Sequence, residues 1–357
     1  MTKSIRTAAL LISAILVAAA CAAPRATDQP TTAPATAGAA GTPAATTAPS
    51  FTGKAVNVVT GGTGGVYIVY GAGLANVLSN KLGVAATAQS TTASIDNMKF
   101  IRDKKAELAF TLSDTAFDAV NAKGRFVPPE QPAKAQTLAV LYANITHVVT
   151  KDGTGINTVA DLKGKRVSVG AAGSGTEVIA NRVLEAAGLA AANAQGQLAP
   201  AADIQVQKLS VADSVAALKD GRVDAFFWSG GLPTSAIVDL ANSPGLKAKL
   251  IDHADLVKKM ADKYGAFYFA TTIPKDTYKS DADIKVAGTA NLLVVHPDFD
   301  EALAYAIVKT MFESKADLEK VHPEAKNLVL ATAVEGSPID FHPGAIRYYK
   351  EKGAWKK

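Results

Sequence analysis

Two short loops rich in glycine and hydroxyl residues carry the residue types best suited to chemistry in this 357-residue chain. The first reads GGTGG at residues 61–65, and the second reads AAGSGT at residues 171–176. Glycine lets a ligand approach the backbone closely, and hydroxyl groups add donors beside the free N–H groups at helix starts. This combination favours a bound carboxylate or phosphate. A single such loop is better explained as a sharp turn that caps a helix, so the binding interpretation depends on its repetition in both halves of the chain.

Sequence motifs for nucleotide binding and catalysis are missing. Neither loop matches G-x-x-x-x-G-K-[ST], and neither has the third glycine of G-x-G-x-x-G. The five histidines are scattered without a metal-binding spacing, and no G-x-S-x-G elbow makes Ser174 a nucleophile. Asp96, Asp114 and Glu177 are interpreted as caps in helix first turns, with Glu177 the best candidate to pair with a ligand ammonium. We therefore predict a binding protein without metal or cofactor, not an enzyme.

The two loops belong to a strand-loop-helix pattern that occurs three times and then three times again. Alternation of this kind predicts parallel sheet wrapped by helices, in two similar α/β lobes. In such sheets ligands bind at the carboxyl ends of the strands, where these loops lie. The predicted strands are 55–60, 84–88, 107–111, 166–170, 204–209 and 225–228, and the predicted helices are 66–82, 176–187 and 211–220, with others beginning near 94, 115 and 234.

Residues 142–151 are predicted to carry the chain into the second lobe, and residues 267–274 to carry it back. Lobe 1 would then consist of residues 51–147 and 270–357, and lobe 2 of residues 148–269. Helices near 300–314 and 343–352 would complete lobe 1. His147 is interpreted as a structural residue in a β-rich run, and His342 as a residue that orders the turn into the last helix.

The amino terminus has the pattern of an export signal. Lys3 and Arg6 precede an apolar stretch that ends near residue 20 and is shorter than the ~20 residues of a membrane-spanning helix. Cys21, the only cysteine, follows at the expected cleavage point, so residues 1–20 are predicted to be a signal peptide and Cys21 a lipidated first residue. Cleavage with a spectator cysteine is the alternative. Residues 22–50, rich in Ala, Thr and Pro, suit a disordered tether, which predicts a membrane-anchored lipoprotein outside the cytoplasm.

The charge pattern gives no support for nucleic-acid binding. The formal net charge is +5, and two of these units come from the first fifty residues. The remaining charges are spread along the chain among opposite charges, without a basic block interleaved with aromatics. No further apolar run is long enough to cross a bilayer.

Several motifs, taken together and in order, resemble the TAXI solute receptors of tripartite ATP-independent periplasmic (TRAP) transporters. This resemblance implies a two-lobed α/β periplasmic-binding-protein type II fold with a central ligand cleft. It also implies a ligand such as glutamate, glutamine or a dicarboxylate, and an ion-driven membrane partner. Two departures concern the ligand: Leu112 stands where the family pattern has Gln, and Trp228 is bulkier than the usual residue. The motifs are residues 60–67 (TGGTGGVY), 89–97, 161–170 (DLKGKRVSVG), 173–177 (GSGTE), 230–233 (GGLP) and 342–349.

We therefore predict capture of a small carboxylate or amino acid by closure of the lobes, followed by delivery to TRAP membrane subunits. The alternatives are a receptor for an ABC importer, a hydrolase or transferase acting on an anion, and a receptor that feeds a sensor. No arginine lies in the candidate loops, which predicts that neutral donors hold the ligand acid. The predicted ligand-binding residues are Thr63, Gly64, Gly65, Tyr67, Ser94, Asn97 and Ser113 from lobe 1, and Ser174, Gly175, Thr176 and Trp228 from lobe 2.

Overall fold

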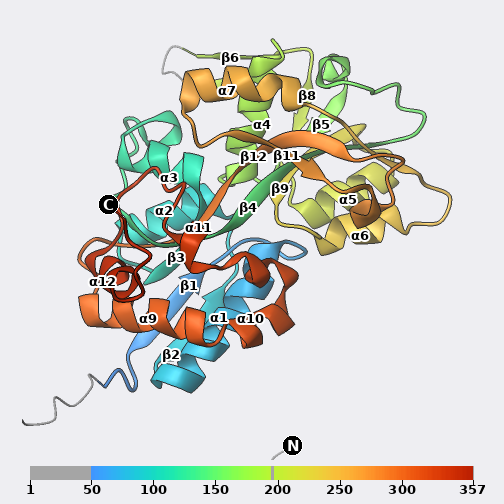
Figure 1. Cartoon of the computed structure of the whole chain (residues 1–357). Coiled ribbons are helices and arrows are strands. Elements are labelled where there is room, and N and C mark those ends of the chain that lie inside the picture. Colours follow the sequence, from blue (N-terminus) through green and yellow to red (C-terminus); the bar gives the residue numbers. More distant parts are fainter. Residues whose placement is uncertain (1–49, 194–196, 357) are drawn as a thin grey trace, which may run out of the picture. The chain divides into compact units, whose positions relative to one another are not determined.

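The computed structural model of the chain describes residues 50–193 and 197–356 (Figure 1). The predicted signal peptide, Cys21 and all but the last residue of the tether lie outside the described residues. Within these residues, no helix combines the length and the apolar character that a bilayer crossing needs.

The first three strands form a parallel sheet in the order β2-β1-β3. β3 is buried at every position, and the apolar face of α1 packs on the sheet. Gly83 ends α1 in the left-handed conformation, where its N–H donates to the Ser79 carbonyl. The elements are β1(Ala55–Val59), α1(Val66–Leu82), β2(Ala85–Gln89), α2(Ser94–Arg102), β3(Leu108–Leu112), α3(Ser113–Val120) and the short η1(Gly124–Phe126).

The second set of strands repeats the arrangement of the first, in the order β8-β5-β9. A small two-stranded sheet, β6(Ala190–Ala192) with β7(Leu198–Pro200), follows α4. The repeat confirms the predicted pair of similar α/β halves. Its elements are η2(Val159–Leu162), β5(Arg166–Ser168), α4(Gly175–Ala186), β8(Gln205–Gln207), α5(Val211–Lys219), β9(Ala225–Gly230) and α6(Ser235–Ala241).

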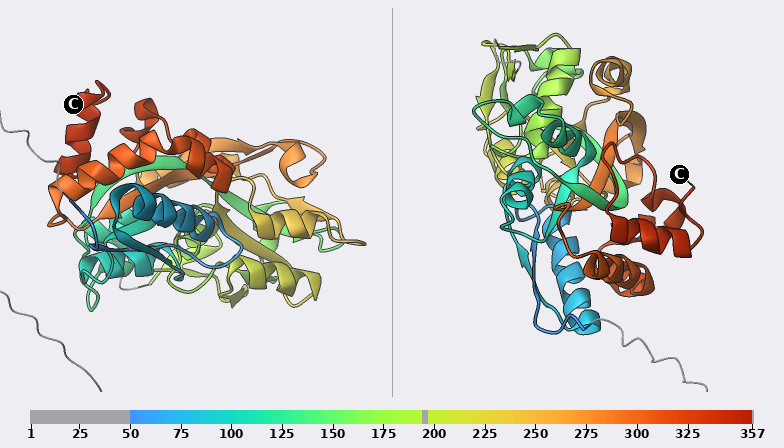
Figure 2. Two further views of the ribbon diagram at one scale, coloured as in Figure 1. Left: turned by 90° about the horizontal axis from the view of Figure 1, so that it is seen from below. Right: turned by 90° about the vertical axis from the view of Figure 1, so that its left-hand side faces the viewer.

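Two long antiparallel strands, β4(Gln136–Lys151) and β12(Ile284–Val295), join the halves into one ten-stranded sheet (Figures 1 and 2). β12 pairs with β3 of the first half, β4 pairs with β9 of the second, and the two strands pair with each other. The chain thus returns through β12. The predicted return segment instead contains β11(Phe269–Ile273), which pairs antiparallel with the first part of β12. Short edge elements are β10(Ala248–Leu250), η3(Ala254–Leu256), α7(Val257–Tyr264) and α8(Lys275–Tyr278).

Each half has helices on both faces of its part of the sheet and therefore its own apolar core. We call the halves lobe 1, around β1 and β3, and lobe 2, around β5 and β9; their predicted boundaries remain a prediction. The C-terminal helices belong to the core of lobe 1, where they pack with α1. These helices are α9(Glu301–Glu313), α10(Lys315–Val321), η4(Pro323–Asn327), α11(Leu330–Ala333) and α12(Pro343–Glu351).

Two histidines take the structural places that their sequence context indicates. His342 is the N-cap of α12, and its ring accepts from the Gly344 N–H. His147 is fully buried on β4, and its Nδ1 lies 2.9 Å from the Ile145 carbonyl oxygen. Burial lowers the pKa of His147 to about 4, so its ring is neutral near pH 7.

Candidate functional site

A cavity of about 130 Å³ lies between the lobes, at the carboxyl ends of the parallel strands. Loops that follow β1, β2, β5 and β8 surround it together with the last residues of β9, so both lobes contribute to its wall. The strand-loop-helix pattern predicts this location. The lining residues are Gly61, Gly62, Gly65, Val66, Tyr67, Thr91, Thr92, Ala93, Ser94, Leu112, Gly170, Ala171, Ser174, Gly175, Thr176, Leu209, Ser210, Val211, Trp228, Ser229 and Gly230.

The structure brings most of the predicted ligand-binding residues to this cavity and leaves some outside its wall. Those that line it are Gly65, Tyr67, Ser94, Ser174, Gly175, Thr176 and Trp228. Those that do not line it are Thr63, Gly64, Asn97 and Ser113.

The four residues outside the wall have other positions. Thr63 is exposed, and the Gly64 carbonyl accepts from the Ser235 hydroxyl across the lobes. The buried Asn97 amide donates to the Thr60 carbonyl just after β1 at 2.6 Å and to the Phe110 carbonyl in the middle of β3 at 2.8 Å. Ser113 hydrogen-bonds with Thr289 and accepts from a backbone N–H of β12. Asn97 and Ser113 therefore hold the lobe 1 loops in place from below.

Four helices begin at the cavity wall, two from each lobe. Their first residues, Val66 of α1, Ser94 of α2, Gly175 of α4 and Val211 of α5, all line the cavity. Helix starts present free N–H groups and the positive end of the helix dipole. Their convergence in a cavity favours an anionic ligand group.

The four helix starts differ in whether a side chain already accepts a hydrogen bond from their backbone N–H groups. No side chain caps α1 or α2. Ser174 caps α4 by accepting from the Glu177 N–H, and Ser210 caps α5 by accepting from the Asp213 N–H. The Ser210 hydroxyl also donates to the Asp213 carboxylate at 2.7 Å. The Ser174 hydroxyl hydrogen is therefore the better placed to bond a ligand oxygen.

A chain of buried polar side chains runs beneath the cavity from one lobe to the other. The Tyr67 hydroxyl donates to Asn291 Oδ1 at 2.6 Å, and Asn144 Nδ2 donates to the same oxygen at 3.1 Å. Ser229 in turn donates to Asn144 Oδ1. Burial raises the pKa of Tyr67, which stays neutral. The chain fixes Tyr67 and Ser229 at the cavity wall and ties their positions to the two strands that join the lobes.

Trp228 closes one side of the cavity by packing on lobe 1 glycine. A Cβ on Gly65 would lie 2.9 Å from the tip of the Trp228 ring, so only glycine permits this approach. The Trp228 Nε1 donates to the Thr234 hydroxyl at 2.8 Å, which fixes the ring. Trp228 therefore lies at the cavity wall, and its contact with a ligand remains a prediction.

None of the nearby carboxylates reaches the cavity wall. Asp96 accepts from the Thr92 hydroxyl. Glu177 accepts from the Gly173 N–H at 2.9 Å and forms an ion pair with Lys208 at 2.8 Å.

The cap interpretation is incomplete for Asp114. It does accept from the N–H of Thr115 in the first turn of α3. It is also wholly buried, accepts from the Tyr268 hydroxyl at 2.5 Å and lies 3.6 Å from Arg182. Asp114 thus belongs to a buried ionic cluster between the lobes, which the spacing along the sequence did not reveal.

A second cavity, of about 290 Å³, opens between α3, α4 and α7. Charged side chains line it, among them Asp118, Arg182 and Glu185. These charges already have partners: Arg182 binds Asp118, and Glu185 binds Lys263. The loops at the strand ends line only the first cavity, which is therefore the candidate site.

Residues that line the cavity but were not predicted fall into two classes. Thr91, Thr92 and Ser210 follow strand ends, and that position was the signal that could have selected them. Apolar residues such as Leu112 and Val211 share that position but have no polar side chain, so in sequence they resemble core positions. Among the described residues, no group of three or more His, Cys, Asp or Glu side chains is placed to hold a metal ion.

Replacing Ser174 by alanine is expected to weaken ligand binding by about 1–3 kcal/mol, because it removes a donor from a buried anion. The same change removes the cap of α4 and should cost about 1 kcal/mol of folding stability. Calorimetric titration and urea unfolding separate the two effects. Thr158→Ala is the control, since it also removes a side-chain helix cap, that of η2, and Thr158 does not line the cavity. An unchanged affinity in Ser174→Ala would remove this hydroxyl from the site.

Comparison with known proteins gives a family match and distant structural likenesses. The model of the NMT1-like family matches residues 58–353. The substrate binding protein of an amino acid ABC transporter is 13% identical, with 75% of this chain and 96% of that chain covered and a TM-score of 0.44. The periplasmic aliphatic sulphonate binding protein SsuA from Escherichia coli is 15% identical, with 84% and 83% covered and a TM-score of 0.41. An ancestral arginine-binding protein bound to arginine is 16% identical, with 76% and 97% covered and a TM-score of 0.45.

Proposed function

This chain belongs to the NMT1-like family, and we propose that it is an extracytoplasmic receptor. It captures a small carboxylate-bearing solute between its lobes. The chain has the periplasmic-binding-protein type of fold, and the family is one of periplasmic solute-binding proteins. The observation that carries the proposal is the cavity on which four helix starts from both lobes converge.

Binding is proposed to couple to closure of the lobes. Contacts across the cavity mouth are already made in this arrangement: the Ser235 hydroxyl donates to the Gly64 carbonyl at 3.0 Å, and the Ile95 N–H donates to the Gly173 carbonyl at 3.1 Å. A solute large enough to fill the cavity enters only when such contacts open. A ligand that bridges both lobes then stabilises the closed form, which is the form a membrane partner would recognise.

The membrane partner is proposed to be the integral subunits of a TRAP transporter, on the strength of the ordered motifs, with an ABC importer as the alternative. The two partners use different energy sources. Uptake of the solute into vesicles that contain the membrane subunits should therefore depend on an ion gradient for a TRAP partner and on ATP for an ABC partner. The lipid anchor at Cys21 is part of the same proposal, because it would hold the receptor at the membrane surface.

Small carboxylates are expected to stabilise the folded domain and to change its tryptophan fluorescence. A ligand present at a hundred times its dissociation constant adds about 2.7 kcal/mol to the free energy of unfolding. The measurement is a thermal-shift screen of organic acids and amino acids against residues 50–357, followed by fluorescence titration. Trp228 lines the cavity whereas Trp355 lies in the C-terminal segment, so Trp228→Phe should abolish the fluorescence change.

The same screen tests the enzyme alternative. A hydrolase or transferase would consume candidate substrates, whereas a receptor returns each ligand unchanged after denaturation. Turnover of any stabilising compound, detected by mass spectrometry of the incubated mixture, would contradict the receptor proposal.

A further inference from the structure

Among the residues that the structure describes, no Asp, Glu, Lys, Arg or His lines the candidate site. Its polar groups are backbone amides and carbonyls, the hydroxyls of serine and threonine, and Tyr67, whose hydroxyl is committed to Asn291. The remaining wall includes the apolar side chains of Val66, Leu112, Leu209 and Val211 and the Trp228 ring. The site therefore offers donors for one anionic group and apolar surface for the rest of the ligand.

An α-amino acid would need a partner for its ammonium group in this enclosed space. A buried cation without a carboxylate is unfavourable, because neutral carbonyls replace only part of its hydration. The nearest carboxylates are held elsewhere: Glu177 by Gly173 and Lys208, and Asp114 by Tyr268. Asp213 accepts from Ser210, and Asp96 accepts from Thr92. None of these four carboxylates lines the cavity.

A second carboxylate on the ligand meets a similar obstacle. The apolar side chains of Leu112, Leu209 and Val211 lie beside the helix starts, so donors cover only part of the wall. An ionised group placed against these side chains would lose its hydration without gaining donors.

We infer that the site selects a monocarboxylate with an apolar body and no amino group, in preference to amino acids and dicarboxylates. This inference rests on the proposed function and narrows its ligand. It departs from the amino-acid and dicarboxylate ligands that the motif resemblance implies. The carboxylate lies among the N–H groups at the starts of α1, α2, α4 and α5, and the apolar body lies against Trp228.

Titration calorimetry with matched pairs tests this selectivity. Leucine and 4-methylpentanoate differ only in the amino group, as do glutamate and glutarate. We expect 4-methylpentanoate to bind at least about 30-fold more tightly than leucine, because the buried ammonium has no ionised partner. It should also bind more tightly than glutarate. Equal or tighter binding of leucine, glutamate or glutarate would overturn the inference and leave the receptor function standing.

A cavity-wall carboxylate should reduce the preference for 4-methylpentanoate within this pair. Ala171 lines the cavity, so Ala171→Asp is expected to raise the affinity for leucine relative to 4-methylpentanoate by about 10-fold, through a new ion pair with its ammonium. The neighbouring Ala172 is exposed and does not line the cavity, so Ala172→Asp is the matched control and should leave the ratio unchanged. An unchanged ratio in Ala171→Asp would contradict the placement of the amino group in this cavity.

Mass spectrometry of small molecules released by denaturing the purified protein distinguishes a failure of this inference from a failure of the proposed receptor function. A released monocarboxylate without an amino group supports the inference, and a released amino acid or dicarboxylate overturns it while supporting a receptor. If none of the four probes binds and no organic anion is released, the inference and the proposed function both fall.

Discussion

Gly175→Val is expected to lower ligand affinity by more than about 100-fold while both lobes stay folded. A Cβ on Gly175 would lie 2.6 Å from Leu112 Cδ1 and 2.6 Å from Ser94 Oγ, both on the opposite lobe. The added side chain cannot be accommodated in the closed arrangement, and a branched one also fills the cavity. A loss of about 3 kcal/mol in binding corresponds to this factor. Each lobe keeps its own core, so the lobes can separate instead of unfolding.

Calorimetric titration with the ligand found in the screen measures this effect, and circular dichroism verifies the fold. Ala172→Val is the control, because Ala172 is exposed in the same loop and does not line the cavity. A radius of gyration from solution scattering should increase in Gly175→Val and stay constant in the control. Wild-type affinity in Gly175→Val would show that this helix start does not face the opposite lobe when ligand binds.

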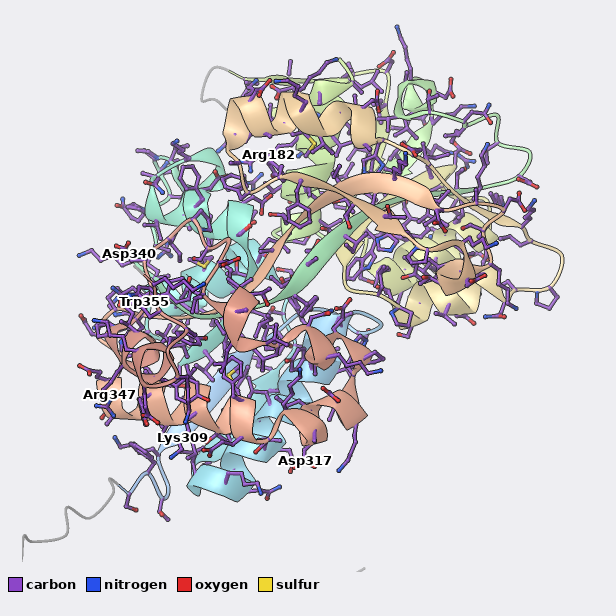
Figure 3. All side chains as sticks on the ribbon, in the orientation of Figure 1. Arg182, Lys309, Asp317, Asp340, Arg347 and Trp355 are labelled. Carbon is purple, nitrogen blue, oxygen red and sulfur yellow. The ribbon has the colours of Figure 1, made fainter. Side chains whose placement is uncertain are left out.

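Arg182→Met is expected to destabilise the protein by about 3–5 kcal/mol, the usual result of leaving buried charges without their partner. Arg182 extends from α4 of lobe 2 (labelled in Figure 3) and is 5% exposed. Its guanidinium donates to Asp118 at 2.5 Å and to the Tyr268 hydroxyl at 2.9 Å. The Tyr268 hydroxyl donates to Asp114, so removal of one cation affects two carboxylates of α3.

Urea unfolding at pH 7 measures the loss. The control is Arg347→Met, because Arg347 (also labelled in Figure 3) is 54% exposed and lies 3.8 Å from Glu301. A surface pair of this kind contributes about 1 kcal/mol or less. Equal losses of unfolding free energy in the two variants would show that the interlobe cluster contributes no more to stability than a surface ion pair.

The same cluster should make stability depend on pH through Asp118. Burial raises its pKa from 3.8 to about 6, with Asp114 adding to the rise and Arg182 and Lys123 opposing it. Between these pH values the folded protein binds this proton more tightly than the unfolded chain. The contribution of Asp118 to stability is therefore present below about pH 4 and is lost, by about 3 kcal/mol, as the pH rises to about 6.

Comparison with Asp118→Asn isolates this term, since other groups titrate in the same range. The lowered pKa values of buried His147 and His253, for example, give the opposite trend, because both rings must charge as the pH falls. The difference in unfolding free energy between wild type and variant should decline from pH 4 to pH 6. A difference that is constant over this range would show that Asp118 titrates normally.

Local patterns predicted the elements around the site. α1 covers the predicted residues 66–82, since its apolar spacing is bounded by Gly65 and by Gly83, which takes the left-handed conformation. β12 was not predicted. Ten consecutive buried residues follow its first two positions, so it lacks the alternation of a half-buried strand, and its partners are distant in sequence.

The residues of the candidate site likewise divide into those that the sequence could predict and those that it could not. Ser174 and Gly175 were predictable, because loops between a strand and a helix carry donors in a known direction. Leu112 was noted only as a departure from a motif, although its side chain faces the opposite lobe. The Arg182 cluster could not be predicted, because its guanidinium and the Asp118 carboxylate are 64 positions apart and meet only when the lobes do.

The joining strands β4 and β12 restrict how the molecule can open. The two strands are hydrogen-bonded to each other. Sliding one lobe along the other would therefore break several of these hydrogen bonds at once, whereas a hinge rotation distorts each of them slightly. The ladder already shifts register between Asn291 and Leu292 and between Leu293 and Val294. Such irregularities bend a strand and concentrate twist. The lobes should thus open by bending of the two strands near these two register shifts, with the hinge on the lobe 1 side of Asn291.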